Sequence, residues 1–167
     1  MREADEEGFH EFVASRWPRL VRLALGLTGD LHLAEDLVQT ALAKVYASWR
    51  RVRQAEDLDG YVYRVLCNAN NDRFRKRRVV EDYRVLMSEP GEPDETATVE
   101  ERAALWAALA ELAPKQRAAV LLRYFEDLSE AQTAAVLGVS IGTVKSQTSD
   151  ALRRLRTSSH LTDGGSR

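Results

Sequence analysis

The sequence predicts an all-α protein made of two small helical domains joined by a flexible, acidic linker. Apolar residues recur at helical spacing in both halves of the 167-residue chain, and no stretch alternates apolar and polar residues as a strand would. Between the halves, residues 80–98 include SEPGEPDET, whose prolines, glycine and acids are typical of a linker. The expected limits are 1–79 for the first domain, 99–157 for the second and 158–167 for a disordered tail.

Three helices are expected in the first domain. The first covers residues 9–27, with a kink or break at Pro18, because proline removes a backbone donor. The second runs over 31–51 and carries one continuous apolar stripe. Residues 52–57 form a loop, and the third helix runs over 59–79, with the aspartate at its start as the expected N-cap.

Two polar faces lie on the second and third of these helices. The face of the second helix includes Asp36, Gln39, Thr40 and Lys44. The face of the third helix consists of Arg64, Asn68, Asn71 and Arg75, which recur at helical intervals. Amide and guanidinium groups suit nucleic acid, and the neighbouring Tyr61, Tyr63 and Phe74 are able to stack on unpaired bases. Plain solvation of both faces, with the three aromatic residues in the core, explains the same pattern.

A tight helical hairpin occupies residues 126–156 of the second domain. Ser129 and Gln132 form a capping box, in which each side chain satisfies a backbone N–H at the start of the helix. Gly138 provides the left-handed turn that most side chains resist, and Ser140 caps the second helix. The sequence therefore predicts a helix-turn-helix.

The second helix of the hairpin has one apolar face and one basic face. Its core-facing residues are Val144, Thr148, Ala151, Leu152 and Leu155. The opposite face contains Gly142, Ser146, Ser149 and Arg153, with Lys145 and Arg156 beside them. A low surface with long basic side chains suits a helix that enters a DNA major groove, whereas an ordinary solvated face is the alternative.

Composition limits the other possibilities. The net charge of −2 disfavours strong DNA binding by the chain alone, because phosphate contacts supply most non-specific affinity. The charge is uneven: the block RFRKRR at 73–78 is basic, and residues 81–101 are strongly acidic. The chain has no apolar run long enough to span a bilayer and no visible signal peptide, so we expect a cytoplasmic protein without membrane insertion.

Catalytic and metal chemistry are not expected. Cys67 is the single cysteine and suits a packing position, while the histidines are scattered at His10, His32 and His160. The abundant carboxylates fall at cap and surface positions, with no pair placed for catalysis. We therefore expect no enzyme activity, no metal and no cofactor.

Three motifs resemble conserved regions of bacterial sigma factors. AEDLVQTALAKVYASW at 34–49 resembles region 2.2, residues 61–75 are similar to regions 2.3 and 2.4, and residues 112–156 are similar to region 4. Two helical domains with a short linker and no middle domain point to the extracytoplasmic-function group. VYASWRRV and DGYVYRVLCNANNDRFRKRR resemble the actinobacterial SigE subfamily in particular.

The resemblance implies a transcription initiation factor that directs core RNA polymerase to promoters and helps to melt the −10 element. Docking on the polymerase clamp helices falls on Asp36, Gln39, Thr40 and Lys44, and the polymerase flap is a further expected contact. Binding of the opened −10 element falls on the loop 55–60, with Asp57 and Leu58, and on Arg64, Asn68, Asn71 and Arg75. Reading of the −35 element falls on Ser140, Gly142, Thr143, Lys145, Ser146, Ser149 and Arg153. The linker would thread toward the polymerase active site, and an anti-sigma factor is a further possible partner.

Two positions depart from the family pattern. Family members usually carry a larger apolar residue near Thr133 and often an arginine near Gln147, so a looser hairpin helix and one phosphate contact fewer are expected. Two other functions compete with the sigma-factor interpretation. One is a stand-alone helix-turn-helix regulator that binds duplex DNA without polymerase, and the other is a helical interaction module that sequesters a regulator.

Overall fold

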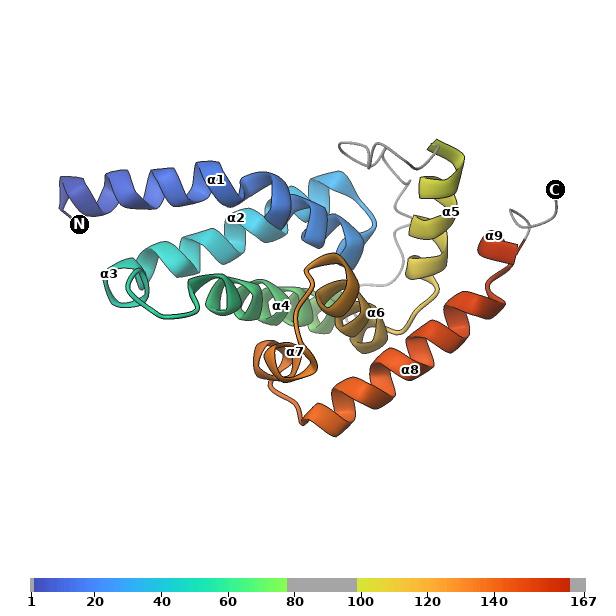
Figure 1. The fold of residues 1–167 in the computed structure, drawn as a ribbon. Coiled ribbons are helices and arrows are strands. Elements are labelled where there is room, and N and C mark those ends of the chain that lie inside the picture. Colours follow the sequence, from blue (N-terminus) through green and yellow to red (C-terminus); the bar gives the residue numbers. More distant parts are fainter. Residues whose placement is uncertain (1, 78–98, 163–167) are drawn as a thin grey trace.

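The computed structural model describes residues 2–77 and 99–162, and this part of the chain is helical without strands (Figure 1). The elements are α1 (Glu3–Thr28), α2 (Leu31–Ala47), α3 (Trp49–Val52), α4 (Leu58–Arg77), α5 (Val99–Ala110), α6 (Pro114–Val120), the π-helical turn η1 (Leu121–Phe125), α7 (Glu130–Leu137), α8 (Ile141–Thr157) and α9 (Ser159–Thr162). We call α1–α4 the N-terminal unit and α5–α9 the C-terminal unit. The expected linker at 80–98 lies outside the described residues.

In the N-terminal unit, α1 and α2 form a hairpin and α4 packs on α2 (Figure 1). Gly29 ends α1 with φ of 75°, and Asp30 caps α2 by accepting a hydrogen bond from Leu33 N–H at 2.8 Å. At the other end of α1, the ring of Phe9 lies edge-on to that of Trp49, and the buried Asp5 forms ion pairs with two arginines of α3 and its following turn. Both ends of the hairpin are therefore fixed.

Three local expectations for this unit differ from the structure. Helix α1 continues across Pro18, so the expected kink or break is not a break; the buried residues 23–27 pack the helix beyond the proline and offset the lost backbone bond. The expected helix over 31–51 is two helices, which separate at Ser48. The N-cap of α4 is Asp57, whose Oδ1 accepts a hydrogen bond from Gly60 N–H at 2.9 Å, whereas Asp59 is paired with Arg16 of α1.

The C-terminal unit contains the expected hairpin, α7 and α8. Ser129 and Gln132 form both bonds of the capping box, at 3.0 and 2.8 Å. Gly138 adopts φ of 67°, and Ser140 caps α8 by accepting from Thr143 N–H at 3.1 Å. Thr133 is fully buried and its hydroxyl lacks a hydrogen-bond partner, so the threonine fills the place of an apolar residue at the cost of one unpaired polar atom.

Beyond α8, part of the expected disordered tail is folded. Ser158 is buried, and α9 packs against α5. Glu111 at the end of α5 accepts a hydrogen bond from the Ser158 hydroxyl at 3.3 Å and forms an ion pair with His160 at 2.9 Å. Composition could not reveal this because both contacts join residues nearly fifty positions apart.

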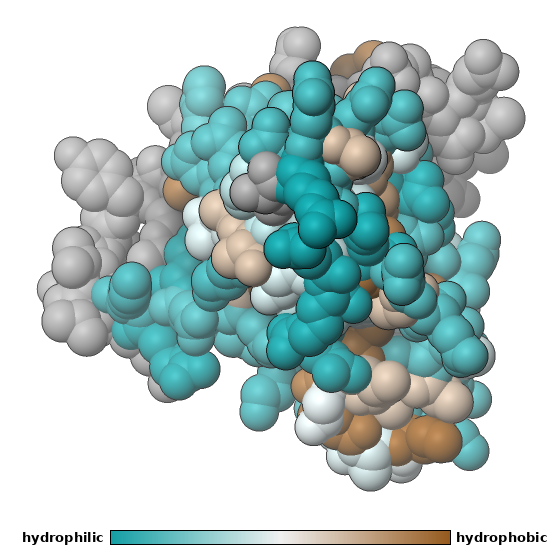
Figure 2. Space-filling view, turned by 90° about the vertical axis from the view of Figure 1, so that its left-hand side faces the viewer, coloured by the Kyte–Doolittle hydropathy of each residue, from teal (hydrophilic) through white to brown (hydrophobic). Residues whose placement is uncertain are grey.

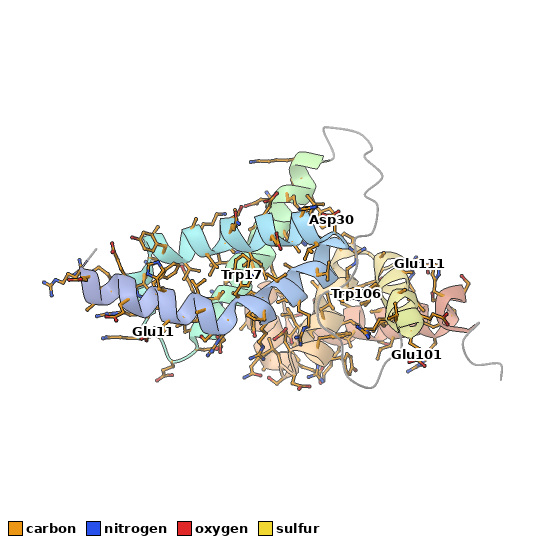
Figure 3. All side chains as sticks on the ribbon, turned by 90° about the horizontal axis from the view of Figure 1, so that it is seen from above. Glu11, Trp17, Asp30, Glu101, Trp106 and Glu111 are labelled. Atoms are coloured by element: carbon orange, nitrogen blue, oxygen red, sulfur yellow. The ribbon has the colours of Figure 1, made fainter. Side chains whose placement is uncertain are left out.

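The two units share one hydrophobic core instead of standing apart. Gly26 in α1 approaches the C-terminal unit so closely that an added Cβ would lie 2.8 Å from the Leu121 side chain and 3.2 Å from the Trp106 ring. Figure 3 shows Trp106 on the side of α5 that faces this end of α1. Hence α5 and η1 close over α1 on the side that α2 leaves open.

A single arginine joins the two units through backbone carbonyls. The Arg117 guanidinium donates to the carbonyls of Leu109, Ala110 and Leu112 at the end of α5, at 2.8 to 3.0 Å, and to that of Leu27 in α1 at 3.0 Å. Burial lowers the pKa of Arg117, and the four acceptors compensate for that desolvation. The side chain thus satisfies carbonyls that end two different helices.

Replacement of this arginine is expected to destabilise the fold. Arg117→Ala should lower the free energy of unfolding by about 2–4 kcal/mol, because four carbonyls, three of them partly buried, lose their donor. Arg117→Lys should recover only part of the loss, since an ammonium cannot reproduce the planar fork. Urea denaturation followed by circular dichroism measures both, with Lys115→Ala, an exposed residue of the same helix, as control. Equal stability of the Arg117→Ala and Lys115→Ala variants would contradict the role of the guanidinium.

Candidate nucleic-acid interface

Helix α8 separates its packing residues from its polar residues. Val144 and Ala151 are fully buried and Thr148 is nearly so, which confirms the expected core face. The side chains proposed to read DNA lie on the other face. Ser140, Gly142, Lys145, Ser146, Ser149 and Arg153 are exposed, and Thr143 is half-buried. The side chains at the start of this face are small and those further along are basic, so the start of the helix could approach the base edges of a DNA groove closely.

Two contacts order the polar face of α8. The Ser140 and Thr143 hydroxyls lie 2.9 Å apart, so the cap also fixes the threonine. Arg153 NH1 lies 3.3 Å from Asp150 Oδ1, one turn earlier on the helix. Because both partners are largely exposed, this pair orients the guanidinium more than it stabilises the helix.

The polar stripe of α4 is exposed at all four of its positions. Arg64, Asn68, Asn71 and Arg75 face solvent, and Arg75 forms an ion pair with Asp72 at 3.1 Å. The stripe is therefore accessible to a ligand along the length of α4.

The three aromatic residues near this stripe were expected either to stack on bases or to pack in the core, and the structure separates them. Tyr63 is buried and donates a hydrogen bond to Glu126 at 2.8 Å, so it is a core residue. Tyr61 and Phe74 are half-buried, and the Arg73 guanidinium lies 4.8 Å from the centre of the Phe74 ring. Phe74 keeps an open surface beside the stripe, because it lines a cleft with Asn71 and Arg75.

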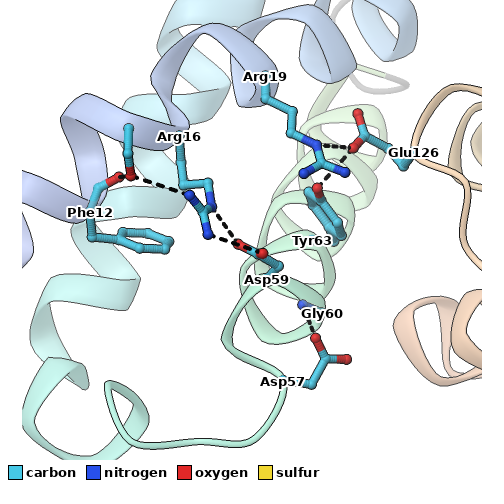
Figure 4. A network of polar contacts seen from close by, with 9 residues as sticks. Phe12, Arg16, Arg19, Asp57, Asp59, Gly60, Tyr63 and Glu126 are labelled. Carbon is cyan, nitrogen blue, oxygen red and sulfur yellow. Dashed lines mark hydrogen bonds and ion pairs between the residues drawn. The ribbon is translucent and has the colours of Figure 1, made fainter.

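The loop before α4 is held by a hydrogen bond between its last residue, Asp57, and the first turn of the helix. Asp57 is exposed and Leu58 is half-buried, and the carboxylate of Asp57 folds back over Gly60, where an added Cβ would lie 2.1 Å from its Oδ2. The absence of a side chain at Gly60 thus permits the cap (Figure 4). Asp59, next to it, faces α1, where Arg16 Nε lies 2.8 Å from its Oδ1.

The polar face of α2 borders a hollow against α4. Asp36, Gln39, Thr40 and Lys44 are exposed, and three of them, Asp36, Thr40 and Lys44, line a hollow of about 610 Å³. Lys44 lies 3.9 Å from Asp72, so this face and the stripe on α4 share one acidic residue. Sequence patterns do not indicate that contact, because the two residues lie on different helices and only the fold sets the register between them.

The cleft between the stripe on α4 and the C-terminal unit was also not predictable from the sequence. A cleft of about 560 Å³ is lined by Asn71, Phe74 and Arg75 on one side and by residues 113–116 and Gln147 on the other. Gln147 therefore faces the N-terminal unit across this cleft. Nothing in the local sequence indicates that α4 and α8 face each other across a cleft.

Other classes of site receive no support from residues 2–77 and 99–162. Within these ranges no group of three or more His, Cys, Asp or Glu side chains could hold a metal ion, and no helix is long and apolar enough to cross a membrane. Figure 2 shows a mainly hydrophilic face whose lower part, where α7 meets α8, is more hydrophobic. Val139 and Ile141 are exposed apolar residues of that turn.

Known proteins with the same arrangement are sigma factors. The family models "Sigma-70 region 2" and "Sigma-70, region 4" match residues 12–79 and 102–155. The RNA polymerase sigma-E factor of Streptomyces coelicolor is 41% identical over 148 residues, which cover 89% of this chain and 84% of that protein. The ECF RNA polymerase sigma factor SigE of Mycolicibacterium smegmatis is 34% identical, with 92% of this chain and 62% of that protein covered.

Solved structures of sigma factors also match this chain. The sigma factor RpoE of Bartonella quintana, in complex with the anti-sigma factor NepR, matches with a TM-score of 0.74 at 30% identity, over 89% of this chain and 94% of that one. CnrH in complex with the cytosolic domain of CnrY matches with a TM-score of 0.64, over 95% and 89% of the two chains, and at 22% identity supports the fold alone.

The cap at the start of α4 gives a test of the loop geometry. Gly60→Ala should displace the Asp57 carboxylate and cost about 1 kcal/mol, the value of an N-cap. In an Asp57→Ala background the same change should stabilise the helix by up to about 1 kcal/mol, since alanine then adds helix propensity without a clash. The coupling between the two sites is measured by urea unfolding of all four variants. Additive effects would show that the cap does not depend on Gly60.

Proposed function

The chain belongs to the sigma-70 family of RNA polymerase sigma factors, and on that premise we propose how its surfaces perform promoter-directed initiation. It acts as a factor of the extracytoplasmic-function type that binds core RNA polymerase and directs it to promoters. The observation that carries this function is the presence of both regions, in order, in one chain whose helix-turn-helix exposes a basic reading face. The chemistry of RNA synthesis belongs to the polymerase.

We assign the −35 element to α8. Ser140, Gly142, Thr143, Lys145, Ser146, Ser149 and Arg153 form the reading face. Arg153, oriented by Asp150, suits a guanine edge or a phosphate, and the small residues at the start of the helix let it approach the groove floor. Asp150 also places a carboxylate on this face, which disfavours phosphate and is able to accept from a cytosine amino group.

We assign the opened −10 element to the start and the exposed stripe of α4. Asp57 and Leu58 form one wall, and Arg64, Asn68, Asn71 and Arg75 continue along the helix. Asparagine has both a donor and an acceptor for an extruded base edge, and the arginines neutralise the strand. A half-exposed Phe74 beside Asn71 adds a ring for stacking.

We assign polymerase docking to α2. Asp36, Gln39, Thr40 and Lys44 are exposed on a helix whose other side is buried in the core, so they are free to contact a partner without disturbing the fold. The solved relatives are complexes with anti-sigma factors, and a partner of that kind is a second expected ligand. A module that only sequesters a regulator would not need the exposed basic face of α8. A stand-alone DNA-binding regulator would not need the N-terminal unit that matches region 2.

The proposed function is tested by reconstitution. The purified chain is added to core RNA polymerase, and run-off transcription is scored from the region upstream of its own gene. Transcripts that depend on the chain support a sigma factor. Tight, sequence-specific binding of duplex DNA by the chain alone, measured by fluorescence anisotropy at physiological salt, would instead support the stand-alone regulator.

Substitutions on α8 test the −35 assignment. Arg153→Ala and Lys145→Ala should each weaken promoter recognition by about 1–3 kcal/mol, the value of one base or phosphate contact. Transcription should fall from promoters with an intact −35 element, while circular dichroism stays unchanged because both residues are exposed. Glu101→Ala, on α5 and away from α8, is the surface control. Unchanged transcription from either variant would remove that residue from the reading face.

Asn68→Ala tests the assignment of strand opening. An extruded base costs a few kcal/mol, which its pocket must recover, so the variant should form open complexes poorly on duplex DNA. A template with a pre-melted bubble across the −10 element should restore much of the activity. Equal loss on both templates would place Asn68 in assembly or folding, and full activity on both would leave the α4 stripe as a solvated face.

A further inference from the structure

Glu126 is a buried carboxylate whose side-chain partners both come from the other unit. It is 6% exposed and follows η1 in the C-terminal unit. Arg19 of α1 places Nε 2.6 Å from its Oε2, and Tyr63 of α4 donates its hydroxyl to the same oxygen at 2.8 Å (Figure 4). We call these three residues the latch.

The latch is complete only while the two units are in contact. A buried carboxylate without a partner is strongly unfavourable, so Glu126 occupies this position because Arg19 and Tyr63 meet it there. Burial, and then the hydrogen bond to Glu126, raise the pKa of Tyr63, so the phenol keeps the proton that it donates. The next residue, Asp127, has φ of 52°, a left-handed conformation that is uncommon for a residue other than glycine. The turn that carries the Glu126 carboxylate therefore contains an uncommon left-handed residue directly after it.

Besides the latch and the cleft beside Asn71, the seam between the units contains apolar contacts, one hydrogen bond and a small cavity. Gly26 admits Leu121 at close range, and Arg117 donates to the Leu27 carbonyl. Beside them lies a cavity of about 120 Å³, bounded by Leu27 and Cys67 of the N-terminal unit and by α6, α7 and α8 of the C-terminal unit. Cys67 is the single cysteine of the chain, and burial raises its pKa to about 12. A thiol in that state is almost unreactive.

This arrangement cannot occupy both promoter elements at once. Positions −35 and −10 lie about 25 base pairs apart, which is about 85 Å along B-form DNA. In the structure Asn71 of the proposed −10 surface and Gln147 of the recognition helix line one cleft. The exposed basic face of α8 is open to solvent, so the obstacle is the distance between the surfaces and not the burial of the reading residues.

We propose that the structure is a closed, inactive state in which the Arg19–Glu126–Tyr63 latch holds region 4 against region 2, and that polymerase binding opens it. The consequence for transcription rests on the proposed function, whereas the latch itself is a property of the free chain. Polymerase shifts the equilibrium only by its greater affinity for the separated units, so a weaker latch raises the apparent affinity for polymerase.

Cys67 provides a native reporter of opening. Because it lies at the seam, separation of the units exposes the thiol, and its rate of reaction with a maleimide dye follows the open population. The latch is broken by Arg19→Glu, a change at a half-exposed side chain, and is remade with reversed sign by Arg19→Glu with Glu126→Arg. The matched control is Arg16→Glu, three residues earlier on α1, which breaks the ion pair with Asp59 inside the N-terminal unit.

The expected result is an increase of at least about tenfold in the labelling rate of Arg19→Glu, since a hydrogen bond to a buried charge is lost. The double reversal should return toward the wild-type rate, and Arg16→Glu should not differ from wild type. Small-angle scattering should show a larger radius of gyration for Arg19→Glu, with circular dichroism unchanged. Equal rates for Arg19→Glu and wild type, or equal increases in both single variants, would overturn the latch.

A polymerase titration separates this inference from the proposed function. Arg19→Glu should bind core polymerase more tightly than wild type, by no more than the fold-change in labelling, because both report the same opening equilibrium. A faster labelling rate without any polymerase binding by either protein would leave the latch standing and refute the sigma-factor function. Binding by both proteins with identical labelling would refute the latch alone.

Discussion

The burial of residues 23–27, near the C-terminal end of α1, on all sides of the helix is the constraint on which the remaining structure depends. Five consecutive residues, 23–27, are buried, which a surface helix with one apolar stripe never shows. One side of this segment packs on α2, and the other receives η1 and α5. The helix therefore belongs to the cores of both units, which explains why it continues through Pro18 and why Gly26 has no side chain.

Local features were predictable from the sequence because their causes lie within a few residues. The capping box at Ser129, the left-handed Gly138 and the cap at Ser140 each depend on neighbours three or four positions away, and the resemblance correctly identified the family. The choice between Asp57 and Asp59 as the cap of α4 failed for the opposite reason. Asp59 was a good local candidate, but Arg16, forty-three positions earlier, takes its carboxylate.

The docking of the two units could not be predicted for the same physical reason. Glu126 follows YF at the end of an apolar run and resembles any acidic residue of a turn, and only the fold brings Arg19 and Tyr63 to it. Tyr63 illustrates how the structure resolves an alternative that spacing leaves open. Its ring belongs to the core and its hydroxyl to a contact between units, so neither base stacking nor simple packing describes it completely. Of the residues assigned to DNA and polymerase, Leu58 and Thr143 are half-buried and the others are exposed.

The division of α8 into two faces has a consequence for how such factors diversify. Val144, Thr148 and Ala151 hold the helix in place, and none of them is among the residues on the opposite, exposed face, such as Ser149 and Arg153. Substitutions on the exposed face are expected to change stability by only about 0.5 kcal/mol. After gene duplication, a copy could therefore acquire a new set of target genes by drift on one helix face, without passing through an unfolded intermediate.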